Sequence, residues 1–453
     1  MCKFKIIGSG ISGLSASYHL KHLNPSLIEK NDYYGGHIFS ENKNGFIWDE
    51  GPHFSFTNND YVKSLFRKSV NNNYLEYTVE TVNYYSGKWI PHPAQSNLFA
   101  VPEPLRTQCL NDLLESRNST EGLNPENYDE WLRMAFGDVF TDKFSRKYTR
   151  KYWTTDPKNL ATDWVGKRVF YPNIDDVKKG FYGPLDRQTH YIKKVRYPEN
   201  GGYISFANEL VKNANISFNK ELAKVDLVKK ELFFTDGSSQ HYNKLINTIP
   251  LTEFVKKSNL GNEIKQAADR LNCSSVLLVN VIANHRTVRK ENWIYVYDED
   301  KYSTRINCTE LLSPNNAIEG KTGIQVEVYF SKFKTKNESN DYIAKKVIGE
   351  LVEMGLIKDE MLVDSYFTKW IPFANVIFDI NYKNNLDIVL SGLEKYGLER
   401  ELDDLEPTTN WDSKFKQNQK FGDLILAGRY AQWKYFWTDD CVLRGKLIKE
   451  RMK

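Results

Sequence analysis

The first residues whose types and spacing suggest chemistry are three glycines near the start of the chain. Gly8, Gly10 and Gly13 form a Gly-x-Gly-x-x-Gly pattern directly after the apolar run at 4–7. The first glycine of such a pattern allows a tight turn, the second lets the backbone approach a pyrophosphate, and the third lets a helix pack close to a strand. The spacing therefore predicts a strand, a phosphate-binding turn and a helix that together bind a dinucleotide.

The residues around this turn supply the other contacts that a dinucleotide needs. Ile11 and Ser12 open the predicted helix, whose first backbone N–H groups and positive dipole end would face the phosphates. Glu29 ends a second predicted strand, about 20 residues past the first glycine, where a carboxylate accepts hydrogen bonds from ribose hydroxyls. Lys30 follows directly and is assigned to the same site. The charge of Glu29 disfavours a dinucleotide with a 2′-phosphate.

A glycine pair beyond the acid indicates which dinucleotide binds. Gly35 and Gly36 begin six residues after Glu29, and His37 follows them. Glycines at this place let the chain double back close to the cofactor. The extended pattern resembles the long fingerprint of FAD proteins rather than that of NAD proteins, so FAD is the expected cofactor.

Further stretches of the chain also have recognisable spacing. A strand-like run at 45–50 leads into a glycine turn at 51–53, and an aromatic and basic stretch occupies 148–160. A Tyr-Pro-x-x-Gly-Gly turn lies at 197–202, and an apolar strand, a glycine turn and a new helix lie at 424–440. With the N-terminal glycines, these blocks resemble the FAD-containing amine oxidase and protoporphyrinogen oxidase superfamily. Within it they are similar to the branch of UDP-galactopyranose mutase and related polysaccharide-cluster flavoproteins.

This resemblance implies further residues at the cofactor. Beyond the glycine loop and the acid, it assigns to FAD the residues Gly51, His53, Val225, Thr248, Gly428, Arg429, Tyr435, Trp437 and Thr438. Thr438 is also the expected N-cap of the last helix, whose N-terminus would stabilise negative charge on the reduced flavin. Two residues depart from the mutase pattern, because Phe56 replaces a histidine and Trp437 replaces an aspartate.

The resemblance also implies a small anionic substrate. Its expected contacts are Tyr148, Lys151, Trp153, Arg168, Arg305 and Arg429. Arginine suits phosphate because its planar guanidinium group donates two parallel hydrogen bonds. The alternatives are that the aromatic residues of this set are core residues and that Arg305 is an ordinary solvent-facing charge. His53, Arg429 and Tyr435 are the candidate catalytic residues, although a lone histidine is more often structural, and no general base is identified.

The expected fold is α/β, in which a discontinuous Rossmann-like FAD-binding domain carries a helical insertion and an antiparallel-sheet substrate domain. The FAD-binding domain is predicted to be assembled from residues 1–85, 196–253 and 415–453. The helical substrate or cap domain is predicted over 86–195, and the substrate sheet over 254–414. Helical periodicity after the prolines near residue 100 and alternating apolar runs beyond residue 270 favour this division.

Composition limits the partners and the location of the chain. The 453 residues carry a formal net charge of +4 without a strongly basic run, so nucleic acid is not an expected partner. Five scattered cysteines argue against a disulfide framework and a zinc site, and no metal site is predicted. No apolar run approaches the ~18–20 residues of a membrane span, and no signal peptide is recognised. We expect a cytoplasmic protein, leave peripheral membrane contact open, and leave the oligomeric state unassigned, with a dimer as one option.

Two reactions suit such a site, and in both the cofactor carries the difficult chemistry. The leading hypothesis is an FAD-dependent oxidoreductase that takes hydride from a nucleotide-linked or lipid-linked sugar in polysaccharide biosynthesis. The first alternative is a mutase in which reduced flavin acts as a nucleophile at the anomeric carbon of a nucleotide sugar. The second alternative is a non-catalytic flavin-binding subunit of an assembly.

Overall fold

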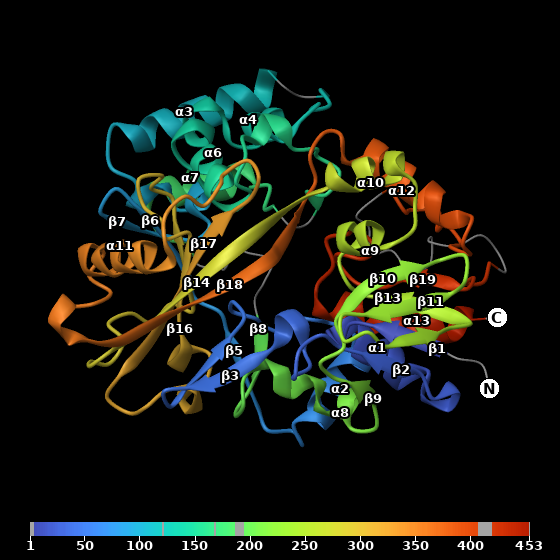
Figure 1. Ribbon diagram of the computed structural model, residues 1–453. Coiled ribbons are helices and arrows are strands. Elements are labelled where there is room, and N and C mark those ends of the chain that lie inside the picture. Colours follow the sequence, from blue (N-terminus) through green and yellow to red (C-terminus); the bar gives the residue numbers. More distant parts are fainter. Residues whose placement is uncertain (1–3, 120–121, 167–168, 186–193, 406–418, 453) are drawn as a thin grey trace.

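Two large sheets and a helical layer organise the molecule (Figure 1). The computed structural model describes residues 4–119, 122–166, 169–185, 194–405 and 419–452. A parallel sheet lies at one end of the molecule beside both termini, and a helical layer lies at the other end. The second sheet, with its long strands β14 and β18, lies between the helical layer and the parallel sheet. The α/β fold with its discontinuous dinucleotide-binding part is confirmed.

The parallel sheet is built from three distant segments of the chain. Its strand order is β19-β13-β1-β2-β9, and all four neighbouring pairs are parallel. The strands are β1 (Phe4–Ile7), β2 (Ser26–Ile28), β9 (Asn215–Ser217), β13 (Lys244–Asn247) and β19 (Leu424–Leu426). The apolar side chains of β1, β2, β13 and β19 are buried, as expected for strands covered on both faces. Helix α1 (Ile11–His19) connects β1 to β2 and completes the predicted β-α-β unit.

The last helix, α13 (Thr438–Arg451), packs directly against α1. A Cβ atom on Gly445 would lie 2.3 Å from Oγ of Ser15, so a larger residue would push the two helices apart. The expectation that Thr438 caps α13 is wrong, because the N-cap residue is Trp437. The backbone N–H of Trp437 donates to the carboxylate of Asp440 at 2.8 Å, which satisfies the start of the helix. The Thr438 hydroxyl instead forms a hydrogen bond of 2.9 Å with the hydroxyl of Tyr203, which lies outside the helix.

The second sheet has seven strands in the order β18-β14-β17-β16-β15-β6-β7. They are β6 (Thr81–Tyr85), β7 (Lys88–Pro91), β14 (Asn272–Ala283), β15 (Trp293–Val296), β16 (Arg305–Cys308), β17 (Thr322–Phe330) and β18 (Val363–Ile377). The neighbouring strands are antiparallel except β6 and β15, which are parallel. Strand β6 falls within the segment 1–85 that we assigned to the FAD-binding domain, yet it pairs within the substrate sheet. The predicted domain limits themselves stay predictions.

The register of this sheet places four polar residues in one transverse row. Asn83 on β6 is opposite Tyr295 on β15, and Tyr295 is opposite Arg305 on β16. Arg305 is in turn opposite Glu327 on β17. Since side chains of paired residues point to the same face of a sheet, the row brings together polar groups from distant parts of the sequence.

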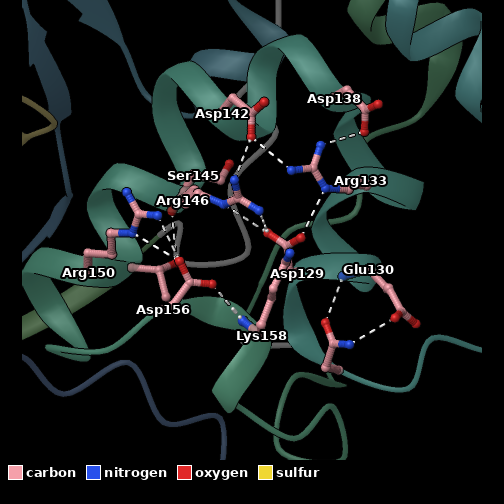
Figure 2. Close-up of polar contacts among 12 residues, drawn as sticks. Asp129, Glu130, Arg133, Asp138, Asp142, Ser145, Arg146, Arg150, Asp156 and Lys158 are labelled. Atoms are coloured by element: carbon pink, nitrogen blue, oxygen red, sulfur yellow. Dashed lines mark hydrogen bonds and ion pairs between the residues drawn. The ribbon is translucent and has the colours of Figure 1, made fainter. Parts of the chain in front are cut away.

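The helical insertion covers one end of the second sheet. Its helices are α3 (Leu105–Ser119), α4 (Tyr128–Phe136), α5 (Asp138–Phe140), α6 (Arg146–Tyr152) and α7 (Ile174–Tyr182), with a π-helical turn at Thr141–Ser145 between α5 and α6. Figure 2 shows the ion pairs that join α4, α5 and α6. The buried carboxylate of Asp129 on α4 accepts from Arg133 at 3.0 Å and from Arg146 at 2.6 Å. Because Arg146 begins α6, this pairing fixes the helix that carries Tyr148.

Smaller elements complete the fold. Two ribbons, β3 (Ser40–Lys43) with β4 (Phe46–Asp49) and β5 (Tyr74–Thr78) with β8 (Lys194–Pro198), connect the two large sheets. A third antiparallel group contains β10 (Leu222–Asp226), β11 (Glu231–Phe234) and β12 (Ser239–His241). The remaining helices are α2 (Asp60–Ser69), α8 (Asn208–Val211), α9 (Leu251–Lys257), α10 (Asn262–Asp269), α11 (Asn340–Glu353) and α12 (Tyr382–Glu394). Within the described ranges, every helix is too short or too polar to cross a membrane.

A buried carboxylate holds the ribbons near the site together. Asp49 accepts hydrogen bonds from the Ser40 hydroxyl at 2.6 Å, the Tyr203 backbone N–H at 3.1 Å and the Tyr197 hydroxyl at 2.8 Å. Burial raises the pKa of Asp49 to about 6, although these hydrogen bonds act in the opposite direction. The folded protein therefore binds this proton more tightly than the unfolded chain, in which an aspartate has a pKa of about 3.9.

This pKa predicts how stability changes with pH. The stabilising contribution of the Asp49 proton is fully present below about pH 4 and is lost as the pH rises through about 6. Relative to Asp49→Asn, the free energy of unfolding of the wild type should fall by roughly 2–3 kcal/mol between pH 4 and pH 7. Urea unfolding curves of both proteins across this range measure the difference. A constant difference across the range would contradict the prediction.

Candidate functional site

One large cavity of about 870 Å³ passes through the described part of the molecule. At one end Gly8 and Glu29 of the β-α-β unit line it, and at the other end Tyr148 of α6 lines it. Between them, Arg305 and Glu327 of the second sheet form part of the wall. The lining is mostly apolar and aromatic with a few polar groups, which is typical of a ligand site.

The three N-terminal glycines play the different roles that their spacing predicts. Gly8 has a φ of +94°, and a Cβ atom there would lie 2.5 Å from Oγ1 of Thr248. A Cβ atom on Gly13 would lie 2.0 Å from the carbonyl oxygen of Gly8, so the helix can approach β1 only with glycine at this position. At Gly10, by contrast, an added Cβ atom meets no described atom closer than 3.8 Å. Gly10 therefore borders open space at the N-terminus of α1, where a ligand can approach the backbone.

The acid after β2 is held in place by the glycine loop. Oε2 of Glu29 accepts from the backbone N–H of Ser9 at 2.9 Å and from its hydroxyl at 2.6 Å. Oε1 accepts from the backbone N–H of Asn31 at 3.0 Å. Gly35 and Gly36 return the chain to this loop, with φ angles of +118° and +56° that favour glycine. These contacts fix the carboxylate of Glu29 at the cavity wall.

His53 and His37 are half-buried histidines in the cavity wall. Burial, with the nearby charges of Arg429 and Arg305, lowers the pKa of His53 to about 4. Burial, with Arg429 and His53, lowers the pKa of His37 to about 3. His53 Nδ1 lies 2.8 Å from the carbonyl oxygen of Gly51, which can only accept, so Nδ1 is the protonated nitrogen. At neutral pH His53 is therefore uncharged, and its Nε2 is a hydrogen-bond acceptor.

Arg305 is the cationic group of the second sheet. Its guanidinium group pairs with the buried carboxylate of Glu327 through both Nε and Nη2. Nη2 also donates to the hydroxyl of Tyr329 at 3.0 Å, and the guanidinium carbon lies 5.2 Å from the ring centre of Tyr152. Burial lowers the pKa of Arg305, but the charge of Glu327 dominates and holds it well above its usual value. The group is a permanently charged and well-oriented donor in the wall.

Arg429 is the second cationic group of the cavity. Its Nε donates to the carbonyl oxygen of Phe436 at 2.7 Å, and Nη1 lies 3.4 Å from Oδ1 of Asn375. The guanidinium carbon lies 5.3 Å from the ring centre of Tyr435. Within the described ranges, no carboxylate lies at ion-pair distance from Arg429. Among the described residues, its positive charge is stabilised by uncharged acceptors and is not compensated by a carboxylate, which favours an anionic ligand.

Aromatic side chains form most of the remaining wall at the helical end. They are Tyr148, Tyr152, Trp153, Trp164, Tyr295, Tyr297, Tyr329 and Tyr435. Several of the rings contact one another edge to face; for example, the Tyr148 ring lies 5.5 Å from the rings of Tyr295 and Tyr297. Such rigid, flat surfaces bind planar groups such as a nucleobase by stacking.

Most of the predicted site residues line this one cavity. They are Gly8, Gly10, Ile11, Ser12, Glu29, Lys30, Gly35, Gly36, His37, Gly51, His53, Tyr148, Trp153, Thr248, Arg305, Gly428, Arg429, Tyr435, Trp437 and Thr438. Their roles toward a ligand stay predictions, but segments far apart in the sequence have been brought together as the resemblance implied.

Lys151 was predicted to contact the substrate, but the structure places its side chain elsewhere. It does not line the cavity, and its side chain is 2% exposed. Its ammonium group donates to the carbonyl oxygens of Asp298 and Ser303 at 2.5 and 2.8 Å. Lys151 therefore holds the loop between β15 and β16 against α6, and burial lowers its pKa to about 7.

Three other predicted site residues lie away from the cavity wall or outside the described residues. Val225 is fully buried within β10 and does not line the cavity, where 220–222 take its place. Gly13 also lies away from the cavity wall and acts through helix packing alone. Arg168 lies outside the residues that the structure describes, so its predicted substrate contact stays a prediction.

A comparison with models of known protein families shows the family of this chain. A model described as flavin-containing amine oxidoreductase matches residues 11–447. The chain belongs to that family. FAD is therefore its cofactor, and the open space beside Gly10, the fixed Glu29 carboxylate and the glycine return at 35–36 fit this group.

Individual proteins with which this flavoprotein was compared share its sequence only in part. A solved structure of reduced UDP-galactopyranose mutase aligns with a TM-score of 0.86 over 98% of this chain and 92% of that chain, at 24% identity. Putrescine oxidase bound to putrescine aligns with a TM-score of 0.61 over 99% and 98%, at 12% identity. Protoporphyrinogen oxidase 2 of Arabidopsis thaliana is 46% identical over 48 residues, which are 10% of this chain and 9% of that protein. The matches show that the fold is shared.

Several cavity residues were not among the predicted site residues. His92 and Gln95 follow β7, and Tyr152, Tyr295 and Tyr329 surround Arg305. Tyr152 lies within the aromatic and basic stretch at 148–160, which was the available signal for it. For the other four the sequence offered no local signal, because each depends on how strands from distant segments pair.

The contrast between Gly10 and Gly13 gives a prediction for flavin binding. Gly10→Val should unfold in urea like the wild type, because its backbone is extended and its Cβ atom has space, yet it should bind FAD roughly 10-fold or more weakly. Gly13→Ala should lose roughly 1–3 kcal/mol of stability through its clash with Gly8. Flavin titration of the apoproteins measures the affinity. Wild-type affinity in Gly10→Val would contradict the proposed approach of FAD to this turn.

Proposed function

We propose that this flavoprotein is a sugar-nucleotide mutase, an isomerase that acts on the sugar of a nucleoside diphosphate sugar. The observation that carries the proposal is the pair of cavity arginines, Arg305 and Arg429. Both line the cavity, and both lie close to Tyr152. The guanidinium carbon of Arg305 is 5.2 Å from the Tyr152 ring centre, and Arg429 Nη1 and the Tyr152 hydroxyl each lie 3.4 Å from Oδ1 of Asn375. Two guanidinium groups suit a diphosphate, since each can bind phosphate oxygens with two parallel hydrogen bonds.

The walls around the two arginines support the same kind of ligand. The aromatic surfaces of Tyr148, Trp153 and Tyr297 at the helical end suit a nucleobase. The space near His53 and Arg429 lies between that end and the FAD loop. A nucleoside diphosphate sugar would then place its sugar toward the flavin and its base toward α6. The similarity in fold to UDP-galactopyranose mutase supports this orientation.

The residues of the chain would contribute binding and charge. Reduced FAD supplies a nucleophile for the anomeric carbon of the sugar. Arg305 and Arg429 would hold the diphosphate and stabilise the negative charge that it gains when its bond to the sugar breaks. Glu327 and Tyr329 keep Arg305 oriented for this task. His53, which is neutral with its acceptor nitrogen Nε2 available for bonding, would orient a hydroxyl group of the sugar.

An anaerobic assay tests the proposal. The flavin-loaded protein is mixed with UDP-galactopyranose, UDP-galactofuranose and a panel of other sugar nucleotides, with and without dithionite. We expect pyranose–furanose exchange only after reduction. Arg429→Leu, which leaves no carboxylate unpaired among the described residues, should retain flavin but lose roughly 10- to 100-fold in kcat/KM. Exchange by the oxidised enzyme, or no exchange with any sugar nucleotide, would count against a mutase.

An oxidoreductase remains a second candidate because of one feature of the cavity. Phe56 and Trp437, the two departures from the mutase pattern, contact each other with ring centres 4.8 Å apart and an interplanar angle of 80°. Both line the cavity, so this part of the wall is apolar at the two positions where mutases carry histidine and aspartate. The two residues that differ from the mutase pattern thus pack against each other. This apolar part of the wall favours chemistry other than that of the mutases.

The same anaerobic experiment distinguishes the second candidate. An oxidoreductase acting on a sugar nucleotide should bleach the flavin absorbance without dithionite, at one flavin per substrate oxidised. Mass spectrometry of the product should then show the loss of two hydrogen atoms. An unchanged flavin spectrum with every sugar nucleotide that binds would rule this reaction out for those substrates.

A further inference from the structure

A bulge in β18 brings Asn375 to the wall of the cavity. On one side of the bulge, Asn375 is opposite Ser274 of β14, and on the other side Ile371 is opposite Val276. Three residues of β18, at 372–374, are therefore opposite a single residue of β14. The bulge and both residues that flank it line the cavity. Bulges are frequent beside active sites, where they change the direction in which a side chain points.

Arg429 determines how the amide group of Asn375 is oriented. Nη1 of Arg429 and the hydroxyl of Tyr152 each lie 3.4 Å from the same atom of this amide. Arginine only donates hydrogen bonds, so the amide atom that faces it is the acceptor oxygen Oδ1. The backbone N–H of Asn375 donates to Oγ of Ser274 at 3.1 Å, which holds the residue at the end of the bulge. The two N–H donors of Nδ2 then point away from Arg429.

The amide nitrogen of Asn375 is a buried donor without a partner among the described residues. The residue is 4% exposed, and its hydrogen bonds to described residues use only Oδ1 and the backbone N–H. A buried amide nitrogen that makes no hydrogen bond is costly, so folded proteins rarely leave one without an acceptor. Since Asn375 lines the cavity, a ligand in the cavity can supply that acceptor.

The position of Arg429 indicates which part of a ligand Asn375 would meet. Arg429 directly follows Gly428, which packs so closely against Ser12 of α1 that no side chain fits there. Arg429 therefore stands at the FAD end of the cavity. A phosphate bound to Arg429 would lie beside the Asn375 amide, because Arg429 and Asn375 contact each other.

We propose that Asn375 is a substrate-binding residue whose amide N–H groups donate to the phosphate next to the sugar. This inference rests on the proposed function, because it takes the ligand to be a nucleoside diphosphate sugar with its sugar toward the flavin. Phosphate oxygens only accept hydrogen bonds, so they match the free donors of Nδ2. Asn375 adds an uncharged donor to the two arginines and, through Oδ1, keeps Arg429 in place.

Calorimetric titration of the flavin-loaded protein with UDP and with inorganic pyrophosphate tests the proposal. Asn375→Leu removes the amide and keeps a side chain of similar size. We expect this variant to bind both probes roughly 10-fold or more weakly than the wild type, because a hydrogen bond to a charged phosphate is lost. Asn385→Leu is the matched control, since Asn385 is a 7% exposed asparagine of α12 that does not line the cavity. The control should bind both probes like the wild type.

Two further comparisons separate a direct contact from an effect through Arg429. In the first, Asn375→Leu is combined with Arg429→Leu. A residue that contacts the phosphate itself should still weaken UDP binding roughly 3-fold or more in the Arg429→Leu protein. In the second, UMP replaces UDP. Because UMP lacks the second phosphate, Asn375→Leu should weaken UMP binding less than UDP binding.

Other results overturn the inference. If Asn375→Leu binds UDP like the wild type, Asn375 does not bind the substrate, although the proposed function stands. If the effect disappears in the Arg429→Leu protein, Asn375 only positions Arg429. Equal losses for UMP and UDP would contradict a contact with the second phosphate. If the wild type binds neither UDP nor pyrophosphate, the proposed function fails together with this inference.

Discussion

The close approach of α1 to β1 at Gly13 and Gly8 is the constraint on which the cofactor site depends. A Cβ atom at Gly13 would lie 2.0 Å from the Gly8 carbonyl oxygen, so α1 packs on β1 at a distance that only glycine permits. That contact sets the position of the α1 N-terminus and of Gly10 beside the cavity. It also sets the helix surface on which α13 packs through Gly445. The Arg429 segment, which leads into α13, thereby receives its place in the same wall.

The charged state of each ionisable group in the cavity follows from the groups that contact it. Arg305 has a carboxylate partner in Glu327, whereas Arg429 is held by a backbone carbonyl and an amide within the described residues. The two histidines between the FAD loop and these arginines stay neutral, since burial and the neighbouring cations both oppose their protonation. The site therefore combines permanent positive charge with neutral acceptors, which suits a ligand that carries phosphates together with hydroxyl and N–H groups.

The sequence predicted the parts of the site that depend on local geometry. The glycine roles, the acid at Glu29 and the glycine return at 35–36 are properties of short segments, so their spacing was sufficient. Lys151 was assigned wrongly to the substrate because the destination of a side chain on a helix depends on what packs against it. The contact of His92 with Tyr295 in the cavity wall could not be predicted, because it follows from the pairing of β6 with β15, which no local pattern in the sequence reveals.

The order in which the strands occur along the chain has a consequence for folding during synthesis. Strand β6 precedes its parallel partner β15 by more than two hundred residues, and β13 (ending at 247) precedes its parallel partner β19 (beginning at 424) by almost as many. Neither large sheet can therefore be completed by the N-terminal half of the chain as it leaves the ribosome. The FAD loop is translated first, but the segment of Arg429 and α13 that closes the cavity is translated last. Unpaired strand edges must stay protected from aggregation until then.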